Sequence, residues 1–275
     1  MKKVIAKRFD KILSNIKSVK IQGAENIAKA GIKAFLLEPN KASAKKILKT
    51  RPTEPLMQNA IKLLLKSKQP EKTAKKFLSN LKTSHEKIVK QGSRLIKNDM
   101  NIFSHCHSST VIDILKYAKR KRKKHFVVYT TEVEPLLQGR QTAKDLAKAG
   151  IKVIVFPDLA AESAIIKCDL FLFGVDAYTK RGVANKIGTS MLCKSAKDFH
   201  IPRYPCGVSL KFTNKLKIEK RNPREVWGTN NKNIEVINPA FDFTRKKFLS
   251  GIISEFGILS PKQFVKKAKQ KLKQL

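Results

Sequence analysis

The feature that most constrains the fold is a regular alternation of short apolar stretches and longer amphipathic stretches between residues 101 and 189. The apolar stretches are rich in Val, Ile and Phe, and they span residues 101–104, 125–129, 151–156 and 169–173. Segments with helical spacing lie between them, at 111–119, 142–149 and 160–167. Because a connection between parallel strands has to cross over the sheet, this pattern predicts a doubly wound parallel sheet whose faces are covered by helices.

The region before this alternation has only helical periodicity. From residue 3 to about residue 97 the apolar residues recur at intervals of three and four, and prolines interrupt the pattern at Pro39, Pro52 and Pro70. We therefore expect an N-terminal helical domain at residues 1–98 and a Rossmann-like α/β domain at residues 99–275. The segment from Glu71 towards Leu95 is long enough to form a helix that links the two.

The C-terminal part of the chain is less regular. The pattern predicts two further strands near residues 200–206 and 233–236, then a helix at 248–256 and a basic helix that begins near Lys262.

The chain is strongly basic. Its 275 residues include 59 Lys and Arg against 21 Asp and Glu, a net charge of +38. Such a charge attracts anions and promotes weak, non-specific association with RNA. Because the lysines are scattered over almost every helical segment, two interpretations stay open: a solvated surface of biased composition, or a functional site for polyanions.

The spacing of the cysteines and the hydropathy of the chain predict its cellular compartment. Cys106, Cys168, Cys193 and Cys206 show no spacing of a zinc or redox pair, and we expect them to be reduced. No apolar run reaches the roughly 18 residues that span a bilayer, and the N-terminal sequence lacks the apolar core of a secretion signal. These observations predict a soluble, cytoplasmic protein with no membrane partner.

Unusual polar residues follow the predicted strands where ligands bind in such sheets. His105, Cys106 and His107 come after the first strand, residues 131–139 after the second, and Asp176 after the fourth. In open parallel sheets, ligands lie beyond the carboxyl ends of the strands. The two histidines do not have the spacing of a metal-ligand set, so we expect no metal and no cofactor.

The short sequence motifs at these strand ends resemble those of one superfamily. It groups the alpha, beta and delta regulatory subunits of translation initiation factor two-B with isomerases of ribose 1,5-bisphosphate and methylthioribose 1-phosphate. The residues that carry the resemblance are Ser104-His-Cys-His-Ser-Ser109, Thr131-Glu-Val-Glu-Pro135, Gln138-Gly139, Gly174-Val-Asp176, Asn185-Lys-Ile-Gly-Thr189 and Asn238-Pro-Ala-Phe-Asp242. The pair of Cys106 and Asp176 looks most like the archaeal ribose 1,5-bisphosphate isomerases.

The resemblance implies that Cys106 acts as a base and Asp176 as an acid, while Asn185 and Lys186 orient the substrate and neutralise its charge. Moving a proton between adjacent sugar carbons needs such a base and acid. The amides of a helix that starts just after Cys106 would favour its thiolate, and burial would keep Asp176 protonated. The plainer alternatives are that Cys106 is a small buried apolar residue, that Asp176 caps a turn, and that Asn185 with Lys186 begins a helix.

The resemblance also assigns substrate-binding positions and shows departures from the enzymes. Gly23, Arg51, Gln138 and Gly139 match the family, whereas Gln22 and Glu134 stand where the isomerases carry arginines. Losing two guanidinium groups weakens the binding of phosphate.

Two functions follow. One is an aldose–ketose isomerase that converts ribose 1,5-bisphosphate to ribulose 1,5-bisphosphate in nucleotide salvage. The alternative is a non-catalytic regulatory protein that binds a sugar phosphate or nucleotide and contacts a translation factor. Similar proteins assemble through the second domain, so we also expect a homo-oligomer, a dimer or a larger assembly of dimers.

Overall fold

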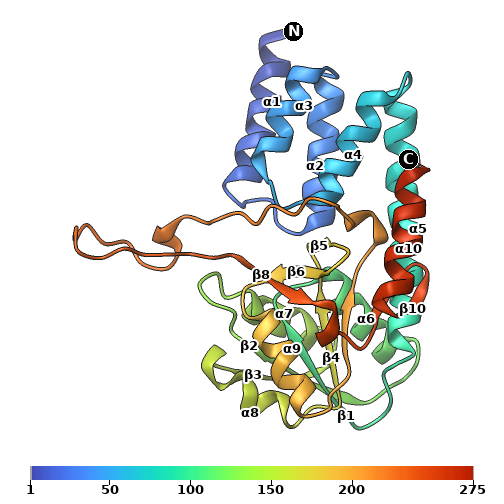
Figure 1. Ribbon diagram of the computed structural model, residues 1–275, viewed down its shortest axis with the longest axis vertical. Coiled ribbons are helices and arrows are strands. Elements are labelled where there is room, and N and C mark those ends of the chain that lie inside the picture. Colours follow the sequence, from blue (N-terminus) through green and yellow to red (C-terminus); the bar gives the residue numbers. More distant parts are fainter. Residues whose placement is uncertain (1, 275) are drawn as a thin grey trace.

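The N-terminal part is a bundle of helices. The computed structural model describes residues 2–274, and in it the helices stand above the sheet (Figure 1). Pro55 and Pro70 occupy first-turn positions of their helices, where the missing amide costs nothing, and Asn40 caps a third by accepting from the Ser43 amide at 2.9 Å. The prediction of an all-helical region is confirmed by α1 (Lys2–Lys17), α2 (Ala24–Leu37), α3 (Lys41–Thr50), α4 (Pro55–Lys66) and α5 (Pro70–Ser93).

A seven-stranded sheet forms the second part. Its order is β10-β9-β7-β4-β1-β2-β3, and all neighbouring strands are parallel except β10 against β9. The strands are β1 (Met100–His105), β2 (Phe126–Thr131), β3 (Lys152–Phe156), β4 (Leu170–Gly174), β7 (Arg203–Cys206), β9 (Ile252–Ser254) and β10 (Gly257–Leu259). The mostly parallel central sheet predicted from residues 101–173 and 200–206 is therefore confirmed.

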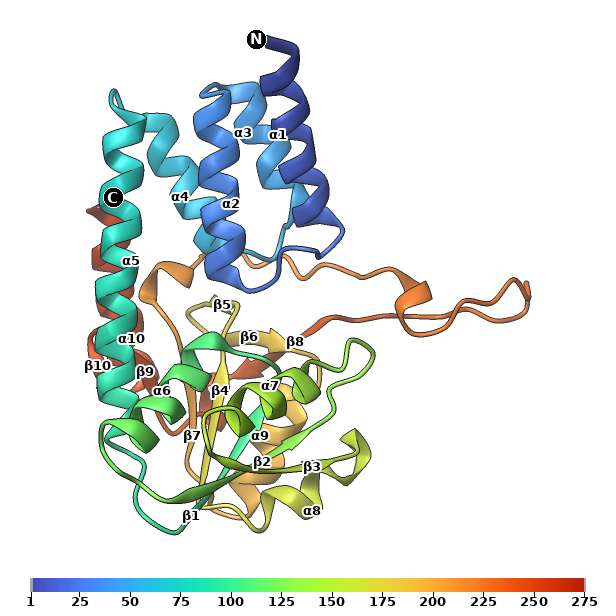
Figure 2. The ribbon, with the colours of Figure 1, turned by 180° about the vertical axis from the view of Figure 1, so that it is seen from behind.

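Helices cover both faces of this sheet (Figure 2). Because side chains alternate along a strand, Ile102 packs into the core that contains Ile114, whereas its neighbour Phe103 packs into the other core, with Leu192. The covering helices are α6 (Ser109–Arg120), α7 (Gln138–Ala147), α8 (Ala161–Ile165), α9 (Thr189–Asp198) and α10 (Pro261–Lys273). None of the helices in residues 2–274 combines the length and apolar character that crossing a bilayer requires.

A small antiparallel sheet was not predicted. It has the order β5-β6-β8 and consists of β5 (Ala177–Tyr178), β6 (Gly182–Lys186) and β8 (Phe241–Arg245). The strand predicted at 233–236 is wrong, because that segment is irregular and pairs with no strand. The helix predicted at 248–256 is also wrong. The apolar residues there are buried at helical intervals, yet they form β9 and the turn into β10, with Gly257 at a φ of 97°.

Residues 213–240 form a long arm that projects from the body of the molecule (Figures 1 and 2). Its base is fastened to the helical part: the Thr53 hydroxyl donates to the Lys217 carbonyl at 2.7 Å and accepts from the Glu219 amide at 2.8 Å. Further out, Val226, Trp227 and Ile237 have exposed fractions of 52%, 56% and 66%. A cluster of large exposed apolar side chains is typical of an interaction surface.

We expect a homo-oligomer from the resemblance described above, and we infer that the exposed apolar side chains of this arm take part in its contacts. The expected result is that the purified protein at micromolar concentration scatters light as a dimer or larger species, and that Trp227→Ala weakens the association because Trp contributes strongly to interfaces. Lys232→Ala, on the same arm, serves as the matched control. A monomer at that concentration would contradict the inference.

Candidate active site

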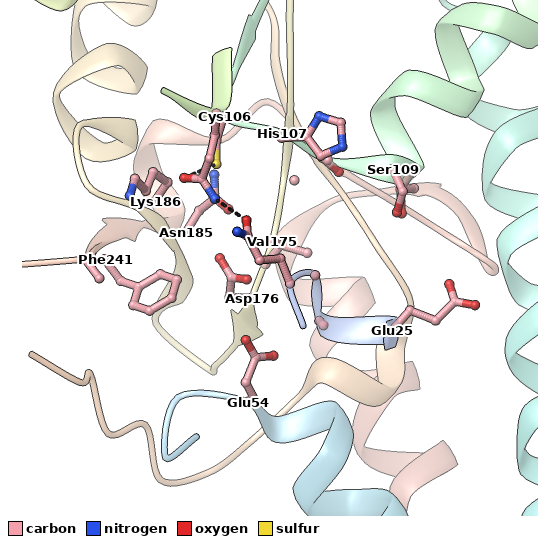
Figure 3. A pocket seen from close by; sticks show the side chains of 18 of the residues that line it. Glu25, Glu54, Cys106, His107, Ser109, Val175, Asp176, Asn185, Lys186 and Phe241 are labelled. Carbon is pink, nitrogen blue, oxygen red and sulfur yellow. Dashed lines mark hydrogen bonds between the residues drawn. The ribbon is translucent and has the colours of Figure 1, made fainter. Parts of the chain in front are cut away.

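One cavity brings together residues from both parts of the chain (Figure 3). The helical part contributes Gln22, Gly23, Arg51 and Glu54, and the sheet contributes its strand ends. Of the residues predicted from the sequence, those that line the cavity are Gln22, Gly23, Arg51, Cys106, Gln138, Asp176, Asn185 and Lys186.

Cys106 lies in a sharp turn after β1, with a φ of 66° in the left-handed region. The turn is held from two sides, since the Thr142 hydroxyl donates to the Cys106 carbonyl at 3.0 Å and Nδ1 of His107 lies 3.2 Å from the same hydroxyl. Ser108 then caps α6. A non-glycine residue held in this conformation is typical of a functional site, where the surroundings stabilise a strained backbone.

His105 supports the turn as a neutral side chain. It is buried, and its Nε2 lies 3.0 Å from the Ile187 carbonyl. Burial lowers the pKa of His105 to about 4, so the ring is neutral near pH 7 and Nε2–H donates to that carbonyl. The histidine therefore ties the end of β1 to the segment after β6.

The surroundings of Cys106 favour the thiol over the thiolate. Burial raises the pKa of Cys106 to about 12, and the charge of Lys186 offsets only part of this effect. The thiol donates to Oε1 of Gln138 across 3.5 Å. The backbone amide of His107, just before α6, lowers the pKa of the thiol as expected, but the cost of desolvating a charge is larger.

Asn185 and Lys186 reach the cavity from β6. The strand pairs with β8, in a register that sets Asn185 opposite Asp242, and both cavity residues are less than 10% exposed. The Asn185 amide donates to the Thr189 hydroxyl at 3.1 Å, which in turn donates to the Lys186 carbonyl at 2.6 Å. Because both residues lie within strand β6, the alternative that they begin a helix is excluded.

Asp176 follows the buried strand β4, and its amide donates to the Ala184 carbonyl at 2.9 Å. Burial raises the pKa of Asp176, while the positive charges of Lys211, Arg51 and Lys186 oppose that rise. The direction agrees with what an acid catalyst needs.

Arg51 is already engaged by carboxylates. Its guanidinium is buried, with Nη2 3.3 Å from Oε1 of Glu54 and Nε 2.8 Å from Oε1 of Glu219. Burial and the charge of Asp176 raise the pKa of Glu54 to about 8, against the lowering effect of Arg51 and Lys211. Lys211 donates from Nζ to the Val175 carbonyl at 2.6 Å.

Glu54, Lys211 and Glu219 were missed by the sequence analysis. Their only local signal is a charge within an apolar or proline-rich stretch, as in Arg51-Pro-Thr-Glu-Pro55 and Gly207-Val-Ser-Leu-Lys-Phe212. Such a charge is buried only with a partner, and apart from Arg51 the charged groups that act on Glu54, which are Asp176, Lys211 and Glu219, lie more than a hundred residues away.

Two predicted residues do not line the cavity. Glu134 is exposed, and its amide, like that of Val133, donates to the Asp158 carboxylate. Gly139 is structural: a Cβ there would lie 1.6 Å from the Thr131 carbonyl oxygen. The glycine lets α7 approach β2, which sets Gln138 at the cavity. Within residues 2–274 no group of His, Cys, Asp or Glu has the arrangement of a metal site.

Comparisons with known proteins agree with this architecture. The chain is 31% identical to the ribose 1,5-bisphosphate isomerase of Thermococcus kodakarensis over 94% of its length and 92% of that protein. It is also 31% identical to a putative translation initiation factor eIF-2B subunit 2-like protein of Pyrococcus furiosus, covering 94% and 98% of the two chains. The crystal structure of the Pyrococcus horikoshii translation initiation factor eIF-2B superposes with a TM-score of 0.84 at 28% identity, over 94% of this chain and 98% of that one.

The family model described as the initiation factor 2 subunit family matches residues 20–261, which include both the helical part that closes the cavity and the sheet that supports it. The chain belongs to this family.

Proposed function

We propose that the protein is a sugar-phosphate isomerase that converts ribose 1,5-bisphosphate to ribulose 1,5-bisphosphate. The observation that carries the proposal is the convergence of a thiol, a carboxyl group of raised pKa and a buried lysine on one cavity, from Cys106, Asp176 and Lys186. An isomerase needs a base, an acid and a cation to hold its anionic substrate.

The two titratable side chains can carry out every proton transfer of the reaction. Asp176 donates a proton to the ring oxygen as it leaves C1, and the Cys106 thiolate takes the proton on C2, which leaves an enol phosphate. Cys106 then returns its proton to C1, and the Asp176 carboxylate takes the proton of the C2 hydroxyl, which becomes the ketone. Both side chains end as they began, and Lys186 offsets the negative charge that develops between them.

A non-catalytic regulatory role is the second candidate, favoured by the state of the phosphate-binding positions. Gln22 provides no charge at the cavity, and the guanidinium of Arg51 is shared between Glu54 and Glu219. A protein that only senses a sugar phosphate or nucleotide does not need the tight clamp of an enzyme.

Turnover separates the two candidates. Purified protein mixed with ribose 1,5-bisphosphate is expected to form ribulose 1,5-bisphosphate, which can be followed by chromatography or by a coupled carboxylation assay. Stabilisation of the protein by the ligand in a thermal melt, without any product, would instead support the regulatory role.

Replacing the proposed base and acid tests their roles. Cys106→Ser should reduce kcat by about a hundredfold or more, because a hydroxyl is a far weaker acid than a thiol and forms almost no anion to accept the proton. Asp176→Asn should have an effect of similar size, and the double variant should be little slower than either single one, since both act in one proton transfer. Cys168→Ser, at a buried cysteine outside the cavity, is the control. An unchanged rate for Cys106→Ser would place the base elsewhere.

Replacing Gln22 and Glu134 by arginine should have unequal effects on substrate binding. Gln22→Arg is expected to tighten substrate binding about tenfold, because it adds a charge-assisted hydrogen bond worth about 1.5 kcal/mol at the cavity. Glu134→Arg should change the KM little, since Glu134 does not line the cavity. Equal tightening by both changes would contradict this distinction.

A further inference from the structure

Glu54 is a buried carboxyl group whose environment the proposed reaction does not explain. Its side chain is 1% exposed, stands directly before α4 and lines the same cavity as Asp176. Oε1 accepts from Arg51, but Oε2 is buried and has no hydrogen-bond partner in the described residues. A buried carboxylate oxygen without a donor costs several kcal/mol, so this atom either holds a proton or awaits one.

Asp176 is the group that Glu54 faces. Both side chains line the same cavity, and the Glu54 carboxyl group points toward Asp176 (Figure 3). Two carboxylates in one buried cavity repel one another, and such pairs reduce the repulsion by keeping one proton.

The surrounding charges permit one proton and not two ionised groups. Arg51 and Lys211 act on both carboxyls, Lys186 acts on Asp176, and Glu219 adds a further negative charge through its ion pair with Arg51. The nearby Cys106 thiol is neutral. Arg51 is divided between Glu54 and Glu219, so the cations offset the repulsion between Glu54 and Asp176 only in part, and the pKa values of both carboxyl groups stay raised.

We propose that Glu54 and Asp176 form a carboxyl pair that shares one proton, with Glu54 as the positioning partner that keeps Asp176 ready to donate. This role rests on the proposed isomerase function. When Asp176 gives this proton to the substrate, both carboxyl groups are ionised, and the positive charges of Arg51, Lys211 and Lys186 stabilise them until the proton returns. Glu54 thus supports the acid without touching the reacting carbons.

The sharing of a proton has a consequence for stability that needs no substrate. The pKa of Glu54 is raised from 4.5 to about 8 in the folded protein, so the folded state holds a proton that the unfolded state has lost in this window. The free energy of unfolding should therefore fall as the pH rises from about 5 to 8 and level off above it. In Glu54→Gln this decline should be reduced, because the amide does not titrate.

The test compares melting temperatures across that pH range for the full-length wild type, Glu54→Gln, Asp176→Asn and the double variant. If the two acids share one proton, Glu54→Gln removes most of the decline, and Asp176→Asn reduces it because one of the charges that raise the pKa of Glu54 is gone. The double variant then removes little more than Glu54→Gln. Glu86→Gln, at an exposed position of α5, should keep the wild-type decline. An unchanged decline in Glu54→Gln, or additive losses in the double variant, would overturn the pair.

Two further measurements distinguish the existence of the carboxyl pair from its role in catalysis. In turnover, Glu54→Gln should lower kcat about tenfold with the KM changed less than about twofold, and Glu54→Asp should recover part of the loss. An unchanged kcat would overturn the role in catalysis. Should Glu54→Gln fail to fold, the infrared carbonyl band of a protonated carboxyl at pH 7 should be present in the wild type and weaker in Asp176→Asn; equal bands would overturn the pair. Because the stability and infrared results need no substrate, they stand even if the protein proves not to be an isomerase.

Discussion

The ion pairs of Arg51 are the interaction on which the arrangement of the two parts depends. Arg51 lies at the end of α3, Glu54 at the start of α4, and Glu219 on the arm that returns from the sheet. Removing one partner of a buried ion pair costs about 3–5 kcal/mol, because the other charge is left without compensation. The Thr53 hydrogen bonds to the arm, and those of Asn59 to the Leu210 and Phe212 carbonyls, act at the same junction. The cavity is closed by polar contacts rather than by apolar packing alone.

This closure buries the proposed base and acid away from water, which hinders the base and helps the acid. It raises the pKa of the Cys106 thiol, so few molecules carry the thiolate at neutral pH. The thiolate that does form is a stronger base for the same reason, and a more basic group takes a carbon-bound proton faster. For Asp176, burial favours the protonated form that can donate. One environment thus suits both groups only if the rare thiolate is compensated by its reactivity and by Lys186.

The sequence predicts the parts of this structure that depend on local periodicity. Strands β1 to β4 can be recognised as short apolar stretches, and helix α10 by the helical spacing of its apolar residues. Cys106 and Asp176 are found because each lies just after such a strand. The small sheet is missed because β5 has only two residues and β8 lies some 55 residues further along the chain than β6. Glu54 is missed for a related reason. Arg51 is its only charged neighbour in the local sequence, whereas Asp176, Lys211 and Glu219, which also act on its carboxyl group, lie far away along the chain.

The net charge of +38 and the charge of the cavity have to be considered separately. Around the cavity, the cations Arg51, Lys186 and Lys211 face the carboxyl groups of Glu54, Asp176 and Glu219, so most of the excess positive charge lies elsewhere, on lysines spread over the surface. A distributed charge attracts a phosphorylated ligand over about a Debye length, roughly 10 Å at 0.1 M salt, and so affects how often the ligand arrives. It does not select one anion over another. Selection falls to the few donors inside the cavity, which is why single residues such as Gln22 and Glu54 matter more to the chemistry than the many lysines outside it.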